Sequence, residues 1–464
     1  MTATQRILAA TGRAGLALGG TAAAVALGAV VLLAPVPQLA PDTAGIAVTP
    51  DRSAQSVVCT GGVLGLTRGD DPQLTVAHQP QRRSVGTGLI ESAVPASDAL
   101  EGAPVVVTLP VDAPDTSVAA AESTRAETDE LRGLAAAECA RAERTAWLVG
   151  GSTQVGRTTW IVLTNPGEVD ATVDLTVWGE RGLIDAPGTS GIIVGAGTQR
   201  ALPLAGIAVD EASPVIAVAS SGGAIAAHLQ QSIVRGLDPS GVALVTPVQR
   251  PSTRHIIPAL PVVGSQLALE RATGDDAGDA LTTLRMLAPG DIDSDVTVTL
   301  RPADGGTGQV ITTTVGAGAV LDLPLTDLPD GDWAVTVDAS EPLVVAGRTT
   351  VGGASGLDIG WFVPSGALQA GQEVLTSIAP TPGGVSARLH LYAPEGDVTA
   401  TVDGREVLVP LGQSVVLETA SNVGVRLAAD GVLHASASYR GDGLIAGTRI
   451  LPPPLAAQPV LVFP

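Results

Sequence analysis

A short segment that contains proline, glycine and acidic residues occurs three times along the chain, and an alternating apolar and polar segment follows each copy. The three copies are residues 164–170 (TNPGEVD), 288–293 (APGDID) and 393–397 (APEGD). Pro and Gly in such segments favour tight turns, and the alternation favours half-buried strands. The repeated turn and strand therefore predict an all-β chain that is assembled from related domains.

Three apolar segments that begin with an aromatic residue or histidine open the repeats. They are residues 147–151 (WLVGG), 255–259 (HIIPA) and 361–365 (WFVPS), which start 108 and 106 residues apart. Units of about 100 residues with turns every 8–12 residues are typical of β-sandwiches, whereas propeller blades repeat at about 40–50 residues. We predict tandem Ig-like β-sandwich repeats at 147–254, 255–360 and 361–464, each with a core of its own.

Small and β-branched residues must fill these cores, because large apolar side chains are scarce. The 464 residues include 5 Trp, 2 Tyr, 2 Phe and 2 Met, although 45% of the chain is hydrophobic. β-Branched side chains suit a pleated, half-buried surface. In the second repeat Trp333 alternates with Val335 and Val337, so these three side chains should point into the core.

The charge of the chain argues against nucleic acid as a partner. Its formal net charge is −21, from 46 acidic and 25 basic residues. Proteins that bind nucleic acid neutralise phosphates with cationic surface, and this sequence has no basic stretch. An acidic surface of this kind keeps a chain soluble and repels other polyanions.

The N-terminal region has the pattern of a membrane anchor. Residues 14–34 carry no charge, and about 20 apolar residues suffice for a transmembrane helix. Arg6 and Arg13 precede this segment, which by the positive-inside rule places residues 1–13 in the cytoplasm. The alternative is a signal peptide that is cleaved, but Pro41 follows the best small-residue site. Both alternatives place the chain from about residue 35 outside the cytoplasm, with 35–50 as a linker.

Residues 51–146 are predicted to form a β-rich module that carries both cysteines of the chain. Cys59 and Cys139 lie beyond the apolar segment, where two thiols can oxidise to a disulfide; the alternative is two unrelated free thiols. Within this module, residues 128–144 are rich in Ala and charged side chains. That stretch is compatible with a helix, or with a solvated loop or edge segment that leads to Cys139.

Three short motifs carry a resemblance to a known family. They are residues 133–139 (GLAAAEC), 147–151 (WLVGG) and 163–167 (LTNPG). With these motifs the chain resembles an uncharacterised actinobacterial family of large secreted or membrane-anchored proteins with a domain of unknown function. The resemblance covers most of the extracytoplasmic part. It implies a setting in the cell envelope, and it implies no catalytic activity.

No catalytic, cofactor-binding or metal-binding residues can be assigned from the sequence. The five histidines (His78, His228, His255, His390 and His434) do not have the spacing of a zinc protease. Asp291, Asp293 and Asp295 have the spacing of a calcium loop, but Val296 stands where that loop needs Gly. We therefore interpret this segment as a hairpin turn. The glycine segments 194–197 and 315–318 do not complete a nucleotide-binding motif.

Two functions remain as expectations. The first is a non-catalytic, membrane-anchored envelope protein, either a scaffold or a module that binds a partner outside the membrane. The second is an accessory protein that binds or processes envelope glycans. Glycan sites usually present aromatic side chains, and glycosidases need two carboxylates across a cleft. The partners expected are the membrane through the N-terminal helix, and envelope proteins or glycan.

Overall fold

The computed structural model describes residues 46–48, 54–67, 73–94, 104–113, 117–272, 277–452 and 460–462. Two compact units divide the chain, one made of residues 1–51 with 456–464 and the other of residues 52–455. In the first unit, β1 (Ile46–Val48) pairs with β34 (Val460–Val462). The predicted segments 1–13 and 14–34 lie outside the described residues, as does most of the linker 35–50. No helix in the described ranges combines the length and hydropathy needed to cross a bilayer.

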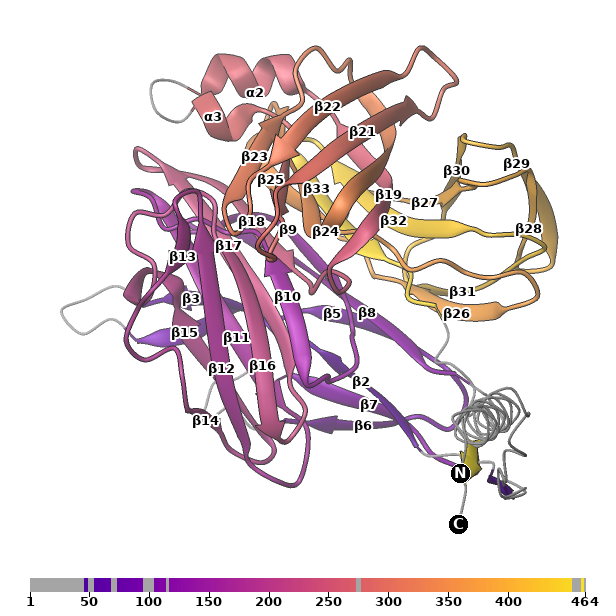
Figure 1. Ribbon diagram of the computed structural model, residues 1–464, viewed down its shortest axis with the longest axis horizontal. Helices are drawn as coiled ribbons and strands as arrows, with labels where there is room; N and C mark the ends of the chain where they lie inside the picture. The colour runs from indigo at the N-terminus through magenta and orange to yellow at the C-terminus, as the bar shows by residue number, and fades with distance from the viewer. Residues whose placement is uncertain are drawn as a thin grey trace, which may run out of the picture. The chain divides into compact units, whose positions relative to one another are not determined.

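The second unit consists almost entirely of antiparallel β-strands, as Figure 1 shows, with only short helices between them. This confirms the predicted predominance of β-structure. Residues 145–245 form two sheets. Their strands, in spatial order, are β10 (Thr145–Val149), β16 (Val215–Gly222), β12 (Ala171–Gly179) and β13 (Gly182–Ile184) with β14 (Ile192–Val194), and then β15 (Thr198–Pro203), β11 (Arg157–Asn165), β17 (Ala226–Arg235) and β18 (Asp238–Val245).

The second and third predicted repeats have the same strand order, which is clearest in the third. The third has β26 (Glu373–Ile378), β31 (Val423–Ala429), β28 (Val398–Val402) and β29 (Arg405–Val409), then β30 (Ser414–Thr419), β27 (Ser386–Tyr392), β32 (His434–Gly441) and β33 (Leu444–Arg449). The second has β19 (Ser252–Val262), β24 (Gly331–Gly353), β21 (Ser294–Pro302) and β22 (Gln309–Val315), then β23 (Val320–Pro324), β20 (Thr283–Leu287), β24 again and β25 (Gly356–Phe362). The long strand β24 takes part in both groups of strands. Its first part pairs with β19 and β21, and its second part pairs with β20 and β25. Two short helices, α2 (Ser265–Arg271) and α3 (Ala277–Ala280), lie between β19 and β20.

In each repeat, the aspartate of the recurring acidic turn accepts a hydrogen bond from a loop that comes later in the sequence. In the first of the three turn motifs, residues 164–170, Asp170 Oδ1 accepts a hydrogen bond from the N–H of Ala196 at 2.9 Å. Asp293 and Asp397 do the same for the N–H groups of Ala317 and Leu411, both at 2.8 Å. The aspartate that ends each motif therefore joins two loops by a charge-assisted hydrogen bond. This contact explains why the motif recurs, and it gives Asp293 a structural partner in place of a cation.

The Cys-bearing part also follows the strand order of the repeats, which the sequence analysis did not predict. Its strands are β2 (Gln55–Cys59), β7 (Val105–Leu109) and β6 (Ile90–Ala93), and then β5 (Gln81–Val85), β8 (Ala119–Glu127) and β9 (Arg132–Glu138), with a hairpin of β3 (Val63–Leu66) and β4 (Leu74–His78) inserted before β5. Like the other three stretches, it ends in a hairpin of its last two strands. Among its described residues, it contains a shorter fourth copy of the same unit.

Of the alternatives predicted for 128–144, the helix and the solvated loop are wrong, because Arg132–Glu138 forms strand β9. The edge segment that leads to Cys139 agrees with the structure, since β9 is the last strand of its sheet, although most of it is buried. Alanine favours helix in isolation, but tertiary packing overrides such a weak propensity. Ala135 and Ala137 are fully buried against Val242 and Leu244 of β18. Small side chains are needed here because β9, which pairs with β8, also packs against β18 and β33 of other copies.

The hydrophobic cores connect the repeats. Trp333, Val335 and Val337 are buried as predicted, and their cluster also contains Phe362 and Ile445. The core of the first repeat likewise includes Val344 from β24 and Trp361 from β25. The domain boundaries stay a prediction, but the apolar contacts continue across them.

The last strands of the four copies pack around a common centre. Strand β9 contacts β18, β18 contacts β25, β25 contacts β33, and β33 contacts β9. Figure 1 shows the four labels close together in the middle of the second unit. The four hairpins that contain these strands therefore form a closed ring.

Asp358 of β25 lies at the centre of this ring and is fully buried. Its Oδ2 accepts the N–H of Leu134 at 2.8 Å and of Ile445 at 3.0 Å. Its Oδ1 accepts the N–H of Ile359 at 2.9 Å and of Val242 at 3.2 Å. One carboxylate thus holds backbone groups from all four copies.

The surroundings of Asp358 leave it without a cation among the described residues, so the N–H groups alone stabilise its charge. Burial raises its pKa, while the four hydrogen bonds favour the charged carboxylate and act in the opposite direction. Gly133 has a φ of +145°, and a Cβ at this position would collide with the carboxylate. Glycine is therefore required where β9 approaches Asp358.

Replacing Asp358 should destabilise the entire second unit. Asp358→Ala leaves four buried N–H groups without an acceptor, so we expect a loss of at least about 3 kcal/mol in the free energy of unfolding. Asp358→Asn keeps one acceptor oxygen and should lie between the alanine variant and the parent. Asp291→Asn, which changes an exposed turn, is the control. Chemical denaturation followed by tryptophan fluorescence measures the effect, and an alanine variant as stable as the parent would contradict this account of the centre.

Candidate functional site

A groove of about 460 Å³ lies at the surface of the second unit. Three parts of the chain form its walls: the segment 140–147 that follows β9, the segments 225–227 and 247–250 of the first repeat, and the segment 449–452 with Gly366. Each part belongs to a different copy or leads out of one. The groove therefore exists only where the ring has closed.

Backbone hydrogen bonds hold the walls of the groove in place. Glu143 and Ile225 exchange two N–H···O bonds of 3.0 and 2.9 Å, and the N–H of Val248 donates to the carbonyl of Trp147 at 2.8 Å. At the other end, Ala140 and Val58 exchange a further pair. The segment that leaves β9 is thus fixed along its length, and the groove is preformed.

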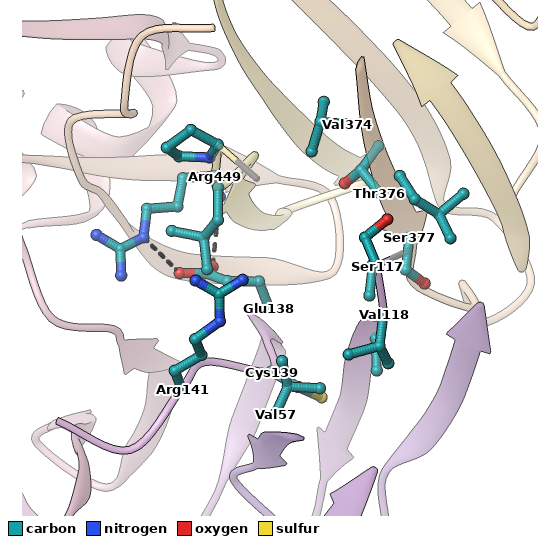
Figure 2. A pocket seen from close by; sticks show the side chains of 15 residues that line it. Val57, Ser117, Val118, Glu138, Cys139, Arg141, Val374, Thr376, Ser377 and Arg449 are labelled. Carbon is teal, nitrogen blue, oxygen red and sulfur yellow. Dashed lines mark hydrogen bonds and ion pairs between the residues drawn. The ribbon is translucent and has the colours of Figure 1, made fainter. Parts of the chain in front are cut away.

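A second, smaller cavity of about 50 Å³ shares several lining residues with the groove, among them Arg141, Arg449 and Pro452. Figure 2 shows Arg449 meeting Glu138 in this cavity, with Arg141 extending towards the same region. Arg449 Nε donates to Glu138 Oε1 at 2.7 Å, and both side chains are about 8% exposed. This buried pair forms the floor between the two cavities and joins the Cys-bearing copy to the third repeat.

Two further arginines lie in the groove. Arg141 and Arg250 are exposed, and neither forms an ion pair within the described part of the chain. Burial of part of Arg141 lowers its pKa, while the nearby carboxylate of Glu143 raises it. A guanidinium group of this kind can bind a carboxylate or a phosphate through two parallel hydrogen bonds.

An aromatic side chain completes the lining. Trp147 stacks on Trp178, with ring centroids 5.4 Å apart and planes inclined by 23°. Both rings are half-buried. Because the Trp178 ring supports it, the Trp147 ring has a fixed orientation at the groove. The site therefore combines two cationic groups, one aromatic ring and polar side chains that include Thr145 and Gln249.

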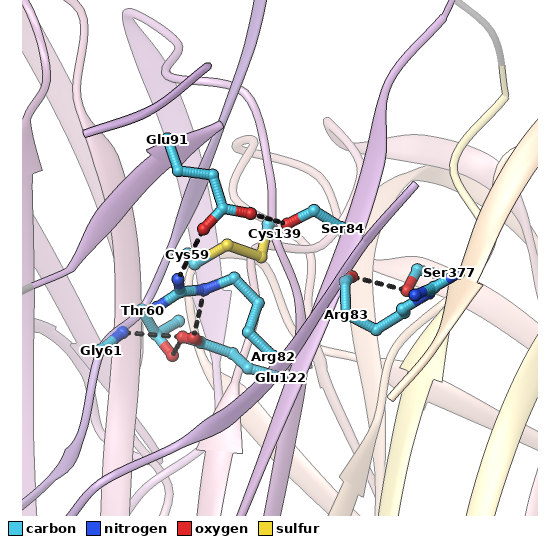
Figure 3. Close-up of a disulfide and its surroundings, with 10 residues drawn as sticks. All are labelled: Cys59, Thr60, Gly61, Arg82, Arg83, Ser84, Glu91, Glu122, Cys139 and Ser377. Carbon is cyan, nitrogen blue, oxygen red and sulfur yellow. Dashed lines mark hydrogen bonds and ion pairs between the residues drawn. A yellow bond between two sulfur atoms is a disulfide. The ribbon is translucent and has the colours of Figure 1, made fainter. Parts of the chain in front are cut away.

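The structure joins Cys59 and Cys139 in the predicted disulfide. Figure 3 shows Glu122 close by, where its carboxylate accepts hydrogen bonds from Thr60, Gly61 and Arg82. Burial raises the pKa of Glu122, and the charge of Arg82 opposes this shift. The disulfide connects β2 to the end of β9, so it fixes the strand from which the groove segment starts.

Three of the histidines, His228, His390 and His434, are buried. Burial lowers the pKa of His228 and His390 to about 3 and that of His434 to about 4. His390 Nε2 lies 2.8 Å from Ser438 Oγ, and His434 Nδ1 lies 3.1 Å from Ser365 Oγ. In the described residues neither pair has a carboxylate beside it, and no cluster of three or more His, Cys, Asp or Glu side chains is arranged to hold a metal ion.

Two buried ion-pair clusters connect the first and second repeats. Arg285 forms a bidentate pair with Asp322 at 2.8 and 2.9 Å, donates to the carbonyl oxygens of Gly151, Ala212 and Pro214, and lies 5.0 Å from the Trp361 ring. The carboxylate of Asp279 receives Arg157 at 2.8 Å and Arg348 at 3.0 Å. The arginine and aspartate side chains of both clusters bind other protein groups, so they stabilise the contact between the first and second repeats.

The carboxylates of both clusters should make the stability of the protein sensitive to acid. Burial alone would raise the pKa of Asp279 and of Asp322, but Arg348 and Arg157 lower the first and Arg285 lowers the second, and both end below the ordinary value of 3.8. A carboxyl group whose pKa is lower in the folded than in the unfolded protein stabilises the fold at pH values above its unfolded pKa. This contribution is lost as the pH falls through its pKa in the folded protein. We therefore expect the free energy of unfolding to fall steeply below about pH 4.

Urea denaturation between pH 2 and pH 6 measures this dependence. The double variant Asp279→Asn with Asp322→Asn should be less stable near neutral pH and should show a shallower decrease in acid. The exposed Asp338→Asn variant is the control and should follow the parent. A double variant whose acid profile is as steep as that of the parent would assign the sensitivity to other groups.

Reduction of the disulfide should destabilise the unit that holds the groove. The two cysteines are 80 residues apart in sequence, and loop entropy sets an upper estimate of about 4 kcal/mol. Thermal melts with and without reductant should differ for the parent and coincide for the double variant Cys59→Ser with Cys139→Ser. Intact-mass analysis of exported protein should find no alkylated thiol before reduction and two afterwards. Alkylation without reductant would show that the bond does not form.

Comparison with known proteins gives one family and several weak structural likenesses. No curated protein matches the chain. Among solved structures, Thermotoga maritima 1070 is 12% identical over 25% of this chain and 95% of its own, with a TM-score of 0.21. An anti-sigma factor domain-containing protein from Clostridium clariflavum is 6% identical over 82% of this chain and 99% of its own, with a TM-score of 0.12. Such low scores support no conclusion about fold or function.

The family is clear from the sequence match. Residues 94–419 match the model of a "Family of unknown function (DUF5719)". This range is more than half of the 464 residues, and it runs from the end of β6 to the end of β30 in the third repeat. The expectation of an uncharacterised family is thereby confirmed, and the chain belongs to the DUF5719 family of unknown function.

Proposed function

We propose that this protein is a non-catalytic, membrane-anchored scaffold that binds a partner outside the cytoplasm through the groove. The observation that carries the proposal is the composition of the groove walls. Segments 140–147, 247–250 and 449–452 come together from the end of the Cys-bearing copy, from the first repeat and from the third repeat. A preformed cavity of about 460 Å³ lies within the range that ligand sites occupy, about 300–1,000 Å³.

The anchor and the compartment are part of the same proposal. The uncharged segment 14–34 would hold the N-terminus in the membrane, with residues 1–13 in the cytoplasm. The disulfide between Cys59 and Cys139 supports an oxidising compartment for the folded part. The shared strand order of the four copies supports an array of Ig-like sandwiches, and an actinobacterial envelope would be a suitable setting.

A second candidate function is that of a glycan-binding accessory protein, and the position of Trp147 favours it. The ring is among the residues that line the groove, and it is stacked on Trp178. Sugar rings pack on aromatic side chains of this kind. For glycan processing, a pair of carboxylates across the cavity would be needed, and Glu143 is the one acidic residue among those that line this groove.

Site-specific photo-crosslinking tests the proposal in intact cells. A photoreactive residue at Gln249, inside the groove, should give a defined adduct, and the same residue at exposed Glu406 on β29 should not. Fractionation and N-terminal sequencing of the same cells should find the chain in the membrane, starting near Met1. Equal labelling at both positions would contradict a partner at the groove. A mature terminus near residues 35–45 in the medium would contradict the anchor.

A further inference from the structure

We propose that the ligand of the groove is an acidic saccharide, in which a sugar ring carries a carboxylate or a phosphate. This inference rests on the proposed function, because it requires the groove to be a binding site. It goes further in naming the chemistry of the ligand. Three observations on the lining residues support it.

The first observation is the charge at the groove. The chain as a whole carries a net charge of −21, so an anion is repelled by most of its surface. Arg141 and Arg250 nevertheless both line this cavity and form no ion pair with the described residues. By contrast, Arg449 on the floor is already paired with Glu138 at 2.7 Å. Two guanidinium groups are thus left to bind an anion.

The second observation is the aromatic wall. Trp147 is held between the backbone of Val248, which donates to its carbonyl, and the ring of Trp178. A sugar ring has one face of C–H groups and a rim of hydroxyls. The indole ring suits the face, and Thr145 and Gln249 can exchange hydrogen bonds with the rim. An anion that lacks a ring would leave this wall unused.

The third observation concerns size and charge density. A cavity of about 460 Å³ has room for one or two sugar rings, which is small compared with a folded protein partner. Glu143 also lines the groove and would repel a second or third closely spaced negative charge. The site therefore favours a saccharide with isolated acidic groups over an acidic peptide with a dense run of carboxylates.

Isothermal titration of the full chain in detergent tests the inference with four probes. They are an oligogalacturonate, a mannose 6-phosphate oligosaccharide, a neutral maltooligosaccharide and a glutamate-rich peptide. We expect at least one acidic saccharide to bind about tenfold or more tightly than the neutral one and the peptide, because charge-assisted hydrogen bonds are stronger than neutral ones. The two acidic probes distinguish a carboxylate ligand from a phosphate ligand.

Matched variants identify the groups that bind. The double variant Arg141→Gln with Arg250→Gln should weaken binding of the acidic saccharide about tenfold or more. Arg144→Gln should not, because this exposed arginine belongs to the same segment but is not among the residues that line the groove. Trp147→Phe should retain more affinity than Trp147→Ala, and thermal melts check that each variant is folded. If the neutral saccharide or the peptide binds as well as the acidic saccharides, if no saccharide binds, or if Arg144→Gln is equally harmful, the inference is wrong. A protein adduct at Gln249 in such a case would leave the proposed function standing with another ligand.

Discussion

The carboxylate of Asp358 is the contact on which the arrangement of the second unit depends. A buried charge without a cation is costly, and it persists only where hydrogen bonds replace its water. Here two N–H groups donate to each oxygen, and the donors come from Leu134, Val242, Ile359 and Ile445. These residues are far apart in sequence and belong to four different copies of one unit. The carboxylate can therefore be satisfied only when all four copies are in place.

The contacts between neighbouring copies follow from this closure. Arg285 and Asp279 join the first two repeats, and Asp332 of β24 meets Arg388 and Arg440 of the third. Breaking a buried pair by removing one partner typically costs about 3–5 kcal/mol. In addition, Trp361 and Phe362 bring apolar surface from one strand into two cores. Copies that share cores and buried charges in this way should unfold together.

The sequence predicted the features that depend on local patterns. The β-class, the acidic turns, the inward face of Trp333 and the disulfide were all accessible from spacing and residue type. The fourth copy was missed because its strands are short and its last strand is rich in alanine. Its signal was a Gly-Leu pair at Gly133, of the kind that also stands near the start of the last strand at Gly356 and at Gly443.

The groove could not have been predicted, since its walls come from segments that are about 80 to 300 residues apart in the sequence. Arg141 and Arg250 carry no motif, and their common position follows from ring closure alone. Asp358 was also missed, because an isolated aspartate in a strand has no distinguishing pattern. Its role depends on N–H groups that other copies supply.

Hydrogen exchange of the native protein tests this account most directly. The amides of Leu134, Val242, Ile359 and Ile445 donate to one carboxylate, so they should exchange only when the entire second unit opens. The account predicts the same free energy of exchange for all four, equal to that of global unfolding. Four values that differ from one copy to the next would show that the copies open independently, and would contradict the central role of Asp358.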